Sequence, residues 1–385
     1  MSVSDFVTNS VSEQILGNDL VINEDACNLG CHYCLTGQSN MKAAHGKQLI
    51  FEPPIADEYG EDTELGKRLN MIVERVNAKL TPPLIKLTGG EVFLIKGIIT
   101  FIEKMAKQHV SVIVQTNALP LNEEKIRRLA SLENLTIQVS LDSNVYEGNS
   151  YRVNSEKLHD KLMGRIFSVI NAGIPTEIYA VLNDRSTNYL KELVQWCGSF
   201  GGDNLPQLFP FPVRGPDSDK YKVQPEQYHL VDAFQDMLEE YSEVLPPKAY
   251  LERLSSFYHQ GRRSWQCHLP RLVISTFSDG VSTPCPNIWF HNMGNLTDDS
   301  QWQTALAKVN NSGFYDLLLS SRPRLSACHG CFTPWDTLSL YFEDVISLEE
   351  LCRAPSYASA AIRQLLVKKK SAMSERITVK HVDSL

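Results

Sequence analysis

Short apolar runs rich in β-branched residues alternate with amphipathic helical patterns between residues 18 and 215. The expected strands are 19–23, 84–88, 110–115, 135–141, 176–182 and 207–211. The helices expected between them are 64–79, 96–107, 123–130, 155–172 and 188–200. Alternation of this kind requires parallel strands joined by crossover helices. Six such strands form either an open doubly wound sheet or an incomplete barrel, and periodicity alone does not separate the two.

The pattern changes in the second half of the chain. A polar, proline-bearing stretch at 216–224 is expected to mark a domain boundary. Two helices are expected next, at 225–243 and 248–260, because Pro246-Pro247 breaks the chain between them. Cysteine-bearing strands follow, so this second region has α+β character and differs from the first.

Length, charge and cysteine usage exclude several classes of function. The chain has 385 residues, which suits a large barrel with an appended domain, and a net charge of −8. Nucleic-acid binding in general needs a basic surface, which this balance argues against. The first ten residues carry no basic side chain, and no apolar run approaches the ~20 residues of a membrane span. We therefore expect a cytoplasmic protein without a membrane or nucleic-acid partner, whose nine cysteines serve metal or redox chemistry.

Three cysteines fall within eight residues directly after the first expected strand: Cys27, Cys31 and Cys34. Three soft sulfur ligands on one tight loop can hold a four-iron cluster and leave its fourth iron open to a small molecule. The C-x3-C-x2-C spacing differs from ferredoxin runs, which end with a fourth cysteine, and from paired zinc knuckles. Taken alone, this triad is also compatible with a zinc or iron carrier loop.

Four further cysteines surround an expected β-hairpin, in which Asp279-Gly280 supplies the positive-φ turn between strands 273–276 and 281–283. The hairpin brings the first two of these cysteines near each other, and a C-x2-C pair downstream completes a set of four sulfurs. They are Cys267, Cys285, Cys328 and Cys331. A closed structural zinc site is the alternative to an iron–sulfur cluster here.

The triad, with Tyr33 between its last two cysteines, resembles the C-x3-C-x-aromatic-C signature of the radical S-adenosylmethionine (SAM) superfamily. Further family-like segments follow in order, each at the end of a successive expected strand: Gly89-Gly90-Glu91, Thr116-Asn117 and Ser140-Leu141-Asp142. Barrel enzymes place their chemistry at that end of the strands. One departure is Ala118, which stands where the family's Thr-Asn-Gly has its glycine.

The resemblance implies a four-iron cluster on the triad that binds SAM and, given one electron, cleaves it to methionine and a 5′-deoxyadenosyl radical. An electron donor of the flavodoxin or ferredoxin type belongs to that chemistry. The SAM contacts that the resemblance implies are Tyr33, Gly89, Gly90, Glu91, Thr116, Asn117, Ser140, Asp142 and Arg152. For Arg152, a surface arginine at a helix cap is the alternative interpretation.

The second cysteine set resembles the opening of the SPASM extension of that superfamily and of its shorter relative, twitch. A full SPASM domain carries further cysteines, but the corresponding positions here are Thr337 and Tyr341. The resemblance therefore implies one auxiliary four-iron cluster. Cys352 is left over as a replacement ligand, a substrate-site thiol or, as we favour, a buried apolar side chain.

The fold class implied by the resemblance is α/β, with a partial (β/α)6 barrel of the TIM type followed by a small α+β SPASM/twitch domain. Residues 1–220 are expected to form the barrel and 221–262 a helical linker. Residues 263–355 are expected to form the auxiliary cluster domain, and 356–385 a C-terminal helix and tail.

Three functions compete. The leading hypothesis is an oxidoreductase that matures a ribosomally made precursor peptide, since most SPASM-bearing chains of this size modify peptides. The alternative is a dehydrogenase or epimerase of a small aminocyclitol or sugar, which shares the single-cluster twitch arrangement. A non-catalytic iron–sulfur electron carrier accounts for the cysteines but not for the strand-end segments. Sulfatase-maturing relatives carry an aspartate base after the cysteine matching Cys285, but Pro286 stands there, so formylglycine formation is not expected and the base is unassigned.

Overall fold

The computed structural model describes residues 14–22, 27–35, 58–214 and 218–382, and the side chains of Asp203 and 374–382 are not described. Several sequence-based expectations lie outside the described residues. These are the polar N-terminal ten residues, Asn23, and the start of the expected boundary at 216–217.

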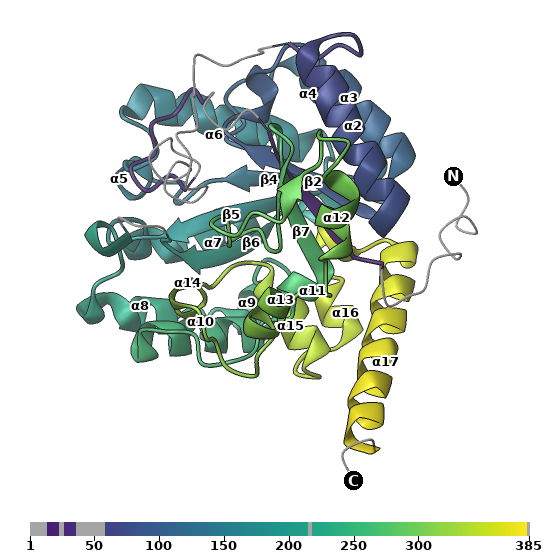
Figure 1. Cartoon of the computed structure of the whole chain (residues 1–385). Helices are drawn as coiled ribbons and strands as arrows, with labels where there is room; N and C mark the ends of the chain where they lie inside the picture. Colours follow the sequence, from purple (N-terminus) through teal and green to yellow (C-terminus); the bar gives the residue numbers. More distant parts are fainter. Residues whose placement is uncertain (1–13, 23–26, 36–57, 215–217, 383–385) are drawn as a thin grey trace.

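Six parallel strands form the centre of the fold, as predicted (Figure 1). Each strand pairs in parallel with the next along the chain, and every residue of the fifth strand is buried. Burial on both faces explains why most residues of these strands are apolar. The strands are β1 (Gly17–Ile22), β2 (Leu84–Gly89), β3 (Ser111–Thr116), β4 (Leu135–Ser140), β5 (Thr176–Leu182) and β6 (Gln207–Pro212).

The C-terminal region extends this sheet at its β1 side. β7 (Val273–Phe277) pairs in parallel with β1, and β8 (Val281–Thr283) and β9 (Gly294–Asn295) continue it in antiparallel pairs. The expected hairpin is confirmed, with Gly280 at φ 91° in its turn. The nine-stranded sheet stays open with β6 and β9 at its edges, which confirms the α/β fold class with a partial barrel. The division of the chain into four units stays a proposal.

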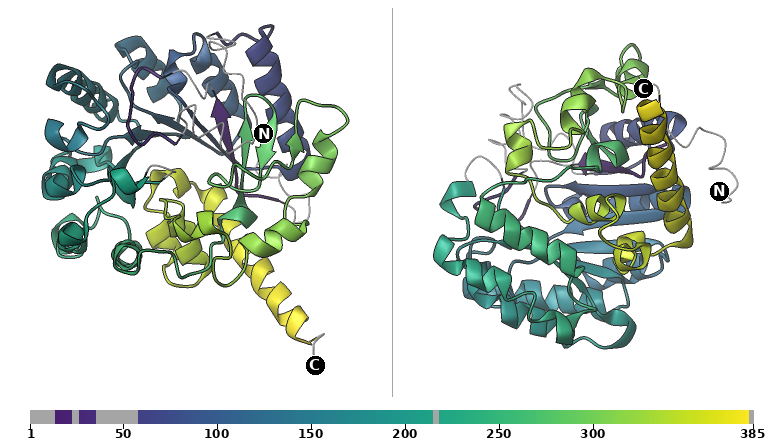
Figure 2. Two further views of the ribbon diagram at one scale, coloured as in Figure 1. Left: turned by 60° about the vertical axis from the view of Figure 1, so that its left-hand side comes forward. Right: turned by 90° about the horizontal axis from the view of Figure 1, so that it is seen from below.

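The predicted crossover helices lie around the outside of the sheet, with the C-terminal part of the chain across its other side (Figure 2). The first of them begins at Thr63, whose hydroxyl accepts a hydrogen bond from the Gly66 N–H, and it buries an apolar stripe. These helices are α2 (Glu64–Leu80), α3 (Ile98–Gln108), α4 (Glu123–Ala130), α6 (Glu156–Asn171) and α7 (Leu190–Gly198). A short helix, α5 (Tyr146–Asn149), precedes α6.

One predicted helix, 225–243, is wrong. The chain there forms a 3-10 turn at Pro225–Gln227 and two short helices, α8 (Tyr228–Asp232) and α9 (Leu238–Tyr241). Between them, hydrogen bonds span three residues instead of four, as from Phe234 N–H to the Val231 carbonyl. This tighter winding turns both of those apolar side chains into the core, so packing overrides the helical pattern.

The helix expected at 248–260 is present as α10 (Lys248–Gln260). Short helices and one long terminal helix complete the chain: α11 (Leu269–Leu272), α12 (Trp302–Ala307), α13 (Gly313–Leu318), α14 (Ser326–His329), α15 (Asp336–Phe342), α16 (Leu348–Leu351) and α17 (Ala360–Val382). Among the described residues, no helix has both the length and the apolar composition that a bilayer crossing requires.

The amino end of the barrel is filled by the C-terminal region. Ser356, in the 3-10 turn Pro355–Tyr357, donates to Glu177 Oε1 from its N–H (3.1 Å) and its hydroxyl (2.6 Å). Ser111, the first residue of β3, donates to the Ser356 carbonyl (3.2 Å). Because these contacts lie where the strands begin, the strands' carboxyl ends are left to form a site.

Candidate active site

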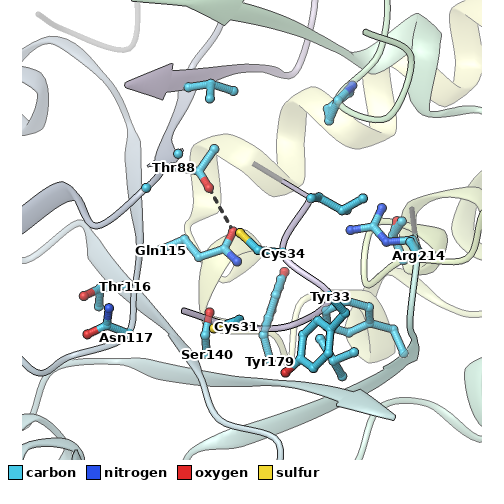
Figure 3. A pocket seen from close by; sticks show the side chains of 18 of the residues that line it. Cys31, Tyr33, Cys34, Thr88, Gln115, Thr116, Asn117, Ser140, Tyr179 and Arg214 are labelled. Carbon is cyan, nitrogen blue, oxygen red and sulfur yellow. Dashed lines mark hydrogen bonds between the residues drawn. The ribbon is translucent and has the colours of Figure 1, made fainter. Parts of the chain in front are cut away.

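A cavity of about 210 Å³ lies at the carboxyl ends of the barrel strands (Figure 3). All three triad cysteines line it. So do all of the residues expected to contact SAM except Asp142, namely Tyr33, Gly89, Gly90, Glu91, Thr116, Asn117, Ser140 and Arg152. The strand-end segments that are far apart in sequence therefore meet the triad at one place.

Gly89 ends β2 in a conformation that requires glycine. Its φ is 135°, and a Cβ at this position would lie 2.0 Å from the carbonyl oxygen of Ile22 on β1. A side chain would push the two strands apart at the point where β1 leads towards the cysteine loop. Glycine here therefore permits the close approach on which the cavity wall depends.

Glu91 is fixed by the end of the neighbouring strand. Its Oε1 accepts from the Thr116 hydroxyl (2.7 Å) and the Phe93 N–H (3.1 Å), and its Oε2 accepts from the Asn117 N–H (2.7 Å). Burial raises the pKa of Glu91, and these hydrogen bonds act in the opposite direction. Oε1 thus accepts two hydrogen bonds and Oε2 accepts one, so Oε2 keeps a lone pair that can accept from a ligand's ammonium.

The backbone conformation of Ala118 explains why the family has a glycine at this position. Its φ is 65°, in the left-handed region that favours glycine, and its N–H donates to the Thr116 hydroxyl (2.9 Å). The tight turn aims the preceding Asn117 at the cysteine loop. Asn117 Nδ2 donates to Asn28 Oδ1 (2.8 Å) and lies 3.9 Å from Cys27 Sγ.

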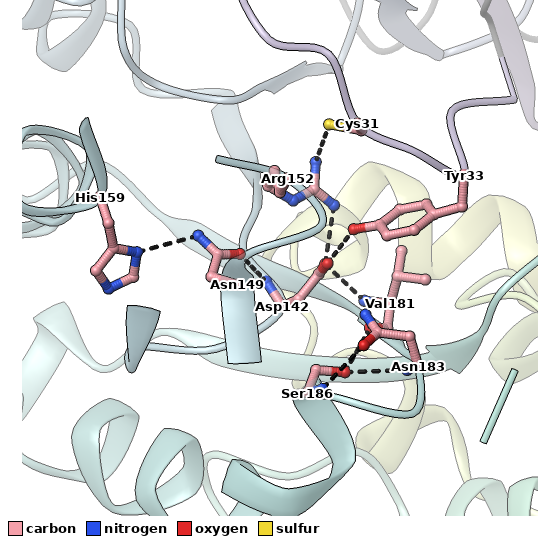
Figure 4. A network of polar contacts seen from close by, with 9 residues as sticks. All are labelled: Cys31, Tyr33, Asp142, Asn149, Arg152, His159, Val181, Asn183 and Ser186. Carbon is pink, nitrogen blue, oxygen red and sulfur yellow. Dashed lines mark hydrogen bonds and ion pairs between the residues drawn. The ribbon is translucent and has the colours of Figure 1, made fainter. Parts of the chain in front are cut away.

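Asp142 lies behind the cavity wall and holds two of the residues that line it (Figure 4). It is fully buried and accepts from Arg152 Nη2 (2.9 Å), from the Val181 N–H (3.2 Å) and from the Tyr33 hydroxyl. Arg152 Nη1 in turn lies 3.6 Å from Cys31 Sγ. Burial opposes the charge of Arg152, but Asp142, Tyr33 and Cys31 together outweigh burial and raise the arginine's pKa well above its ordinary value. Since Arg152 is only 9 % exposed, the alternative of a surface arginine is wrong.

The triad suits an iron–sulfur cluster in its chemistry. Burial raises the pKa of Cys31 to about 12, against the lowering effect of Arg152, and burial also raises the pKa of Cys27. Such thiols give up their protons when they bind a metal. Arg152 and the Asn117 amide place donors near the sulfurs of Cys31 and Cys27, and hydrogen bonds to the sulfurs help to set the properties of thiolate-ligated clusters.

The second cysteine set lines a cavity of its own. All four cysteines, Cys267, Cys285, Cys328 and Cys331, lie on its wall. Burial raises the pKa of Cys328 to about 12 and raises the pKa values of Cys285 and Cys331. In the described part of the chain, no three His, Cys, Asp or Glu side chains converge as ligands of a single metal ion.

The two cavities share part of their walls. Asn287, Thr333 and Trp335 line both of them. Asn287 follows Cys285 by two residues, and Thr333 follows Cys331 by two residues. The loops that carry the second cysteine set thus also bound the cavity at the triad.

The comparison with known families agrees with this geometry. Residues 25–197 match the model of the radical SAM superfamily. The chain carries a radical SAM domain. The resemblance drawn from the triad and the strand-end segments is thereby confirmed, and the superfamily's cofactors are SAM and a four-iron cluster.

One curated relative matches about half of the chain, and solved structures match most of it. The sporulation killing factor maturation protein SkfB of Bacillus subtilis (strain 168) is 25 % identical over 187 residues, which are 46 % of this chain. The chain covers only 38 % of the length of that curated relative. Among solved structures, SuiB of Streptococcus suis bound to S-adenosylmethionine has a TM-score of 0.56 at 14 % identity, over 82 % of this chain and 77 % of SuiB.

Two further structures extend the likeness. SuiB bound to precursor peptide SuiA has a TM-score of 0.57 at 14 % identity, over 91 % of this chain and 76 % of SuiB. Native anSMEcpe with bound AdoMet has a TM-score of 0.54 at 14 % identity, over 95 % of this chain and 99 % of its own. At these identities the likeness shows the fold, and it includes the region after the radical SAM domain.

Two charged residues that line the cavity were not expected from the sequence. They are Asp19 on β1 and Lys86 on β2, and each is 5 % exposed. Lys86 Nζ lies 5.3 Å from the centre of the Tyr179 ring and 5.6 Å from that of Trp335. Asp19 Oδ1 has no hydrogen-bond partner among the described residues. The signal was present in the sequence, because a charged residue inside a central parallel strand is buried and needs a reason.

The two remaining cysteines line neither cavity. Cys197 lies on α7 with no exposed surface and belongs to the hydrophobic core. Cys352 is 3 % exposed at the end of α16, near Tyr341 and Arg363, and burial raises its pKa to about 11. Its position away from both cavities agrees with a buried apolar role.

We expect Asp142→Asn to destabilise the radical SAM domain by about 3 kcal/mol, because it leaves the buried Arg152 guanidinium without a counter-charge. Denaturant unfolding of the two proteins measures this. The control is Glu147→Gln on α5, an exposed carboxylate whose loss should change stability by less than about 0.5 kcal/mol. Equal stability of Asp142→Asn and the parent protein would contradict the account of this network.

Proposed function

We propose that this chain is a radical SAM oxidoreductase that matures a ribosomally made precursor peptide by oxidising or cross-linking it. The proposal rests on one observation: the cavity at the triad and the four-cysteine cavity share a wall. A substrate held between them can react at the first set and lose an electron to the second.

In this proposal the triad holds the SAM-binding cluster, and Cys267, Cys285, Cys328 and Cys331 hold an auxiliary one. Glu91 accepts from the SAM ammonium, Arg152 pairs with the SAM carboxylate, and Tyr33 lies near the adenine. Gly89 and Gly90 allow close approach of the backbone, while Thr116, Asn117 and Ser140 bind the remaining polar groups. Asp142 acts on SAM only through Tyr33 and Arg152, since it lies behind the wall.

The chemistry that a four-iron cluster supplies at the triad is one-electron reduction of SAM, which yields methionine and a 5′-deoxyadenosyl radical able to take a substrate hydrogen atom. The chain's own residues place the reactants and exclude water. Tyr179, Phe211 and Trp335 form apolar walls around the space next to the triad. Such walls protect a reactive intermediate from solvent.

A peptide substrate is supported by the relatives. SkfB is a maturation protein, and SuiB has been solved with its precursor peptide SuiA. We extend this class of substrate to the present chain, together with an electron donor of the flavodoxin or ferredoxin type and a cytoplasmic location. The free thiols of all nine cysteines agree with a reducing compartment.

We further propose that Asp19 accepts the substrate proton. Oxidation of a substrate radical to a closed-shell product releases one proton as well as one electron. Among the carboxylates lining the cavity, Glu91 is held by three hydrogen bonds, whereas Asp19 Oδ1 has no partner among the described residues. Burial raises the pKa of Asp19 against the lowering effect of Lys86, which suits a group that must take up a proton.

The first test is SAM cleavage. Protein reconstituted anaerobically with iron and sulfide, then given SAM and dithionite, should form 5′-deoxyadenosine. Cys31→Ala should abolish this product, because the triad loses a ligand that no other described thiol can replace. Cys352→Ala, a buried cysteine outside both cavities, serves as the control and should retain it. Absence of 5′-deoxyadenosine from the parent protein would overturn the proposed function.

The second test concerns the proton acceptor. Given the precursor peptide as substrate, we expect Asp19→Asn to form 5′-deoxyadenosine but to lower formation of modified peptide by about 100-fold or more. Mass spectrometry of peptide and nucleoside measures both products. Glu177→Gln is the matched control, since Glu177 also faces Lys86 but does not line the cavity. Undiminished peptide modification by Asp19→Asn would rule out Asp19 as the acceptor.

A further inference from the structure

Each cysteine set is accompanied by one buried arginine that pairs with one buried aspartate. At the triad these are Arg152 and Asp142, with side chains 8 % and 0 % exposed. At the second cavity they are Arg263 and Asp336, with side chains 1 % and 2 % exposed. Burying such a pair carries a large desolvation penalty. Its repetition at both cysteine sets suggests a role toward the sulfur sites rather than toward stability alone.

Arg263 is tied to the chain that carries the second cysteine set. Its N–H donates to the His329 carbonyl (2.7 Å) and its Nε donates to the Cys331 carbonyl (2.9 Å). Its guanidinium also hydrogen-bonds the Cys267 side chain. Arg263 lies two residues beyond Gly261, which ends α10 at φ 67° and redirects the chain toward this cavity. One cation therefore contacts both the Cys267 segment and the Cys328–Cys331 loop.

Asp336 fixes the guanidinium from the other side. It accepts from Arg263 Nη2, from Trp265 Nε1 (3.2 Å) and from the Thr333 N–H (2.9 Å). Three donors on two oxygens fix the position of the carboxylate at the start of α15. Its negative charge partly offsets that of Arg263.

Arg263 and Asp336 both line the four-cysteine cavity, and no other charged side chain among the described residues lines it. Arg263 contacts the loop of Cys331 directly through its Nε, whereas Asp336 contacts Arg263 and the Thr333 N–H. The sulfur site therefore has one buried cation beside it and one carboxylate that partly offsets that cation.

We propose that Arg263 raises the reduction potential of the auxiliary cluster, with Asp336 limiting the rise; this rests on the proposed function, which places a cluster there. A four-iron cluster held by four thiolates gains one negative charge on reduction. A buried cation beside it stabilises the reduced state more than the oxidised state. Arg263 is thus a positioning and tuning residue that does not itself react.

The consequence concerns the electron that leaves the substrate. A cluster held by Cys267, Cys285, Cys328 and Cys331 would supply an acceptor for the one electron that the substrate radical loses, while Asp19 takes the released proton. An external carrier of the flavodoxin or ferredoxin type would then remove the electron from this site. A raised potential makes the transfer from substrate to cluster more favourable, and Arg263 biases the site toward accepting the electron.

The test is an EPR-monitored redox titration of the reconstituted protein with both clusters in place. Arg263→Gln should shift the potential of the auxiliary cluster to more negative values, and Asp336→Asn should shift it to more positive values. Arg263→Lys keeps the charge and should stay close to the parent protein. The control Arg262→Gln, at the exposed neighbouring arginine, should leave the potential unchanged. The potential of the triad cluster in the same samples serves as an internal reference.

Opposite shifts for the two substitutions distinguish electrostatic tuning from structural damage, which would move both in the same direction. Shifts of the same sign, or no shift with both clusters loaded, would overturn the role of Arg263. If Arg263→Gln fails to load the second cluster, Asp336→Asn still tests the sign, and a shift of its potential to more negative values would overturn the proposal. A parent protein with no second EPR signal would instead overturn the auxiliary cluster itself.

Discussion

The buried carboxylate of Asp142 is the contact on which the first site depends. It connects the loop of the triad, through Tyr33 and Arg152, to β4 and to the Val181 N–H on β5. Three donors converge on this one side chain, which has no exposed surface. Loss of any one member would leave a buried polar group without its partner, so the network holds the loop only when all members are present. The orientation of the cysteine loop thereby follows from the barrel, to which the described part of the loop is also joined by a hydrogen bond from the His32 N–H to the Tyr151 carbonyl (3.0 Å).

The open sheet explains how a second site can lie so near the first. A closed barrel would leave β1 no free edge, whereas here β7 pairs with that edge and continues through β8 to Cys285. The residues after Cys285 and Cys331 then complete the wall of the first cavity. A short path between the two cysteine sets is a consequence of this topology.

Much of the barrel could be predicted, because strand–helix alternation and buried parallel strands leave a local signal. The strand-end residues were found for the same reason, since each follows a strand. The helix expected at 225–243 failed because the packing of Val231 and Phe234 decides the winding there. Local pattern reveals neither which side of a strand faces the cavity nor a pairing such as β1 with β7. Asp19 and Lys86 were therefore overlooked, and Asp142 was expected to line a cavity that it supports from behind.

The central claim of the account is that two cysteine sets hold two clusters around one substrate space. Iron and acid-labile sulfide, determined per chain after anaerobic reconstitution, test it most directly. Two four-iron clusters predict about eight iron atoms per chain, and about four after replacement of Cys267, Cys285, Cys328 and Cys331 by alanine. About four iron atoms in the unmodified chain, with zinc at the second site, would contradict the account.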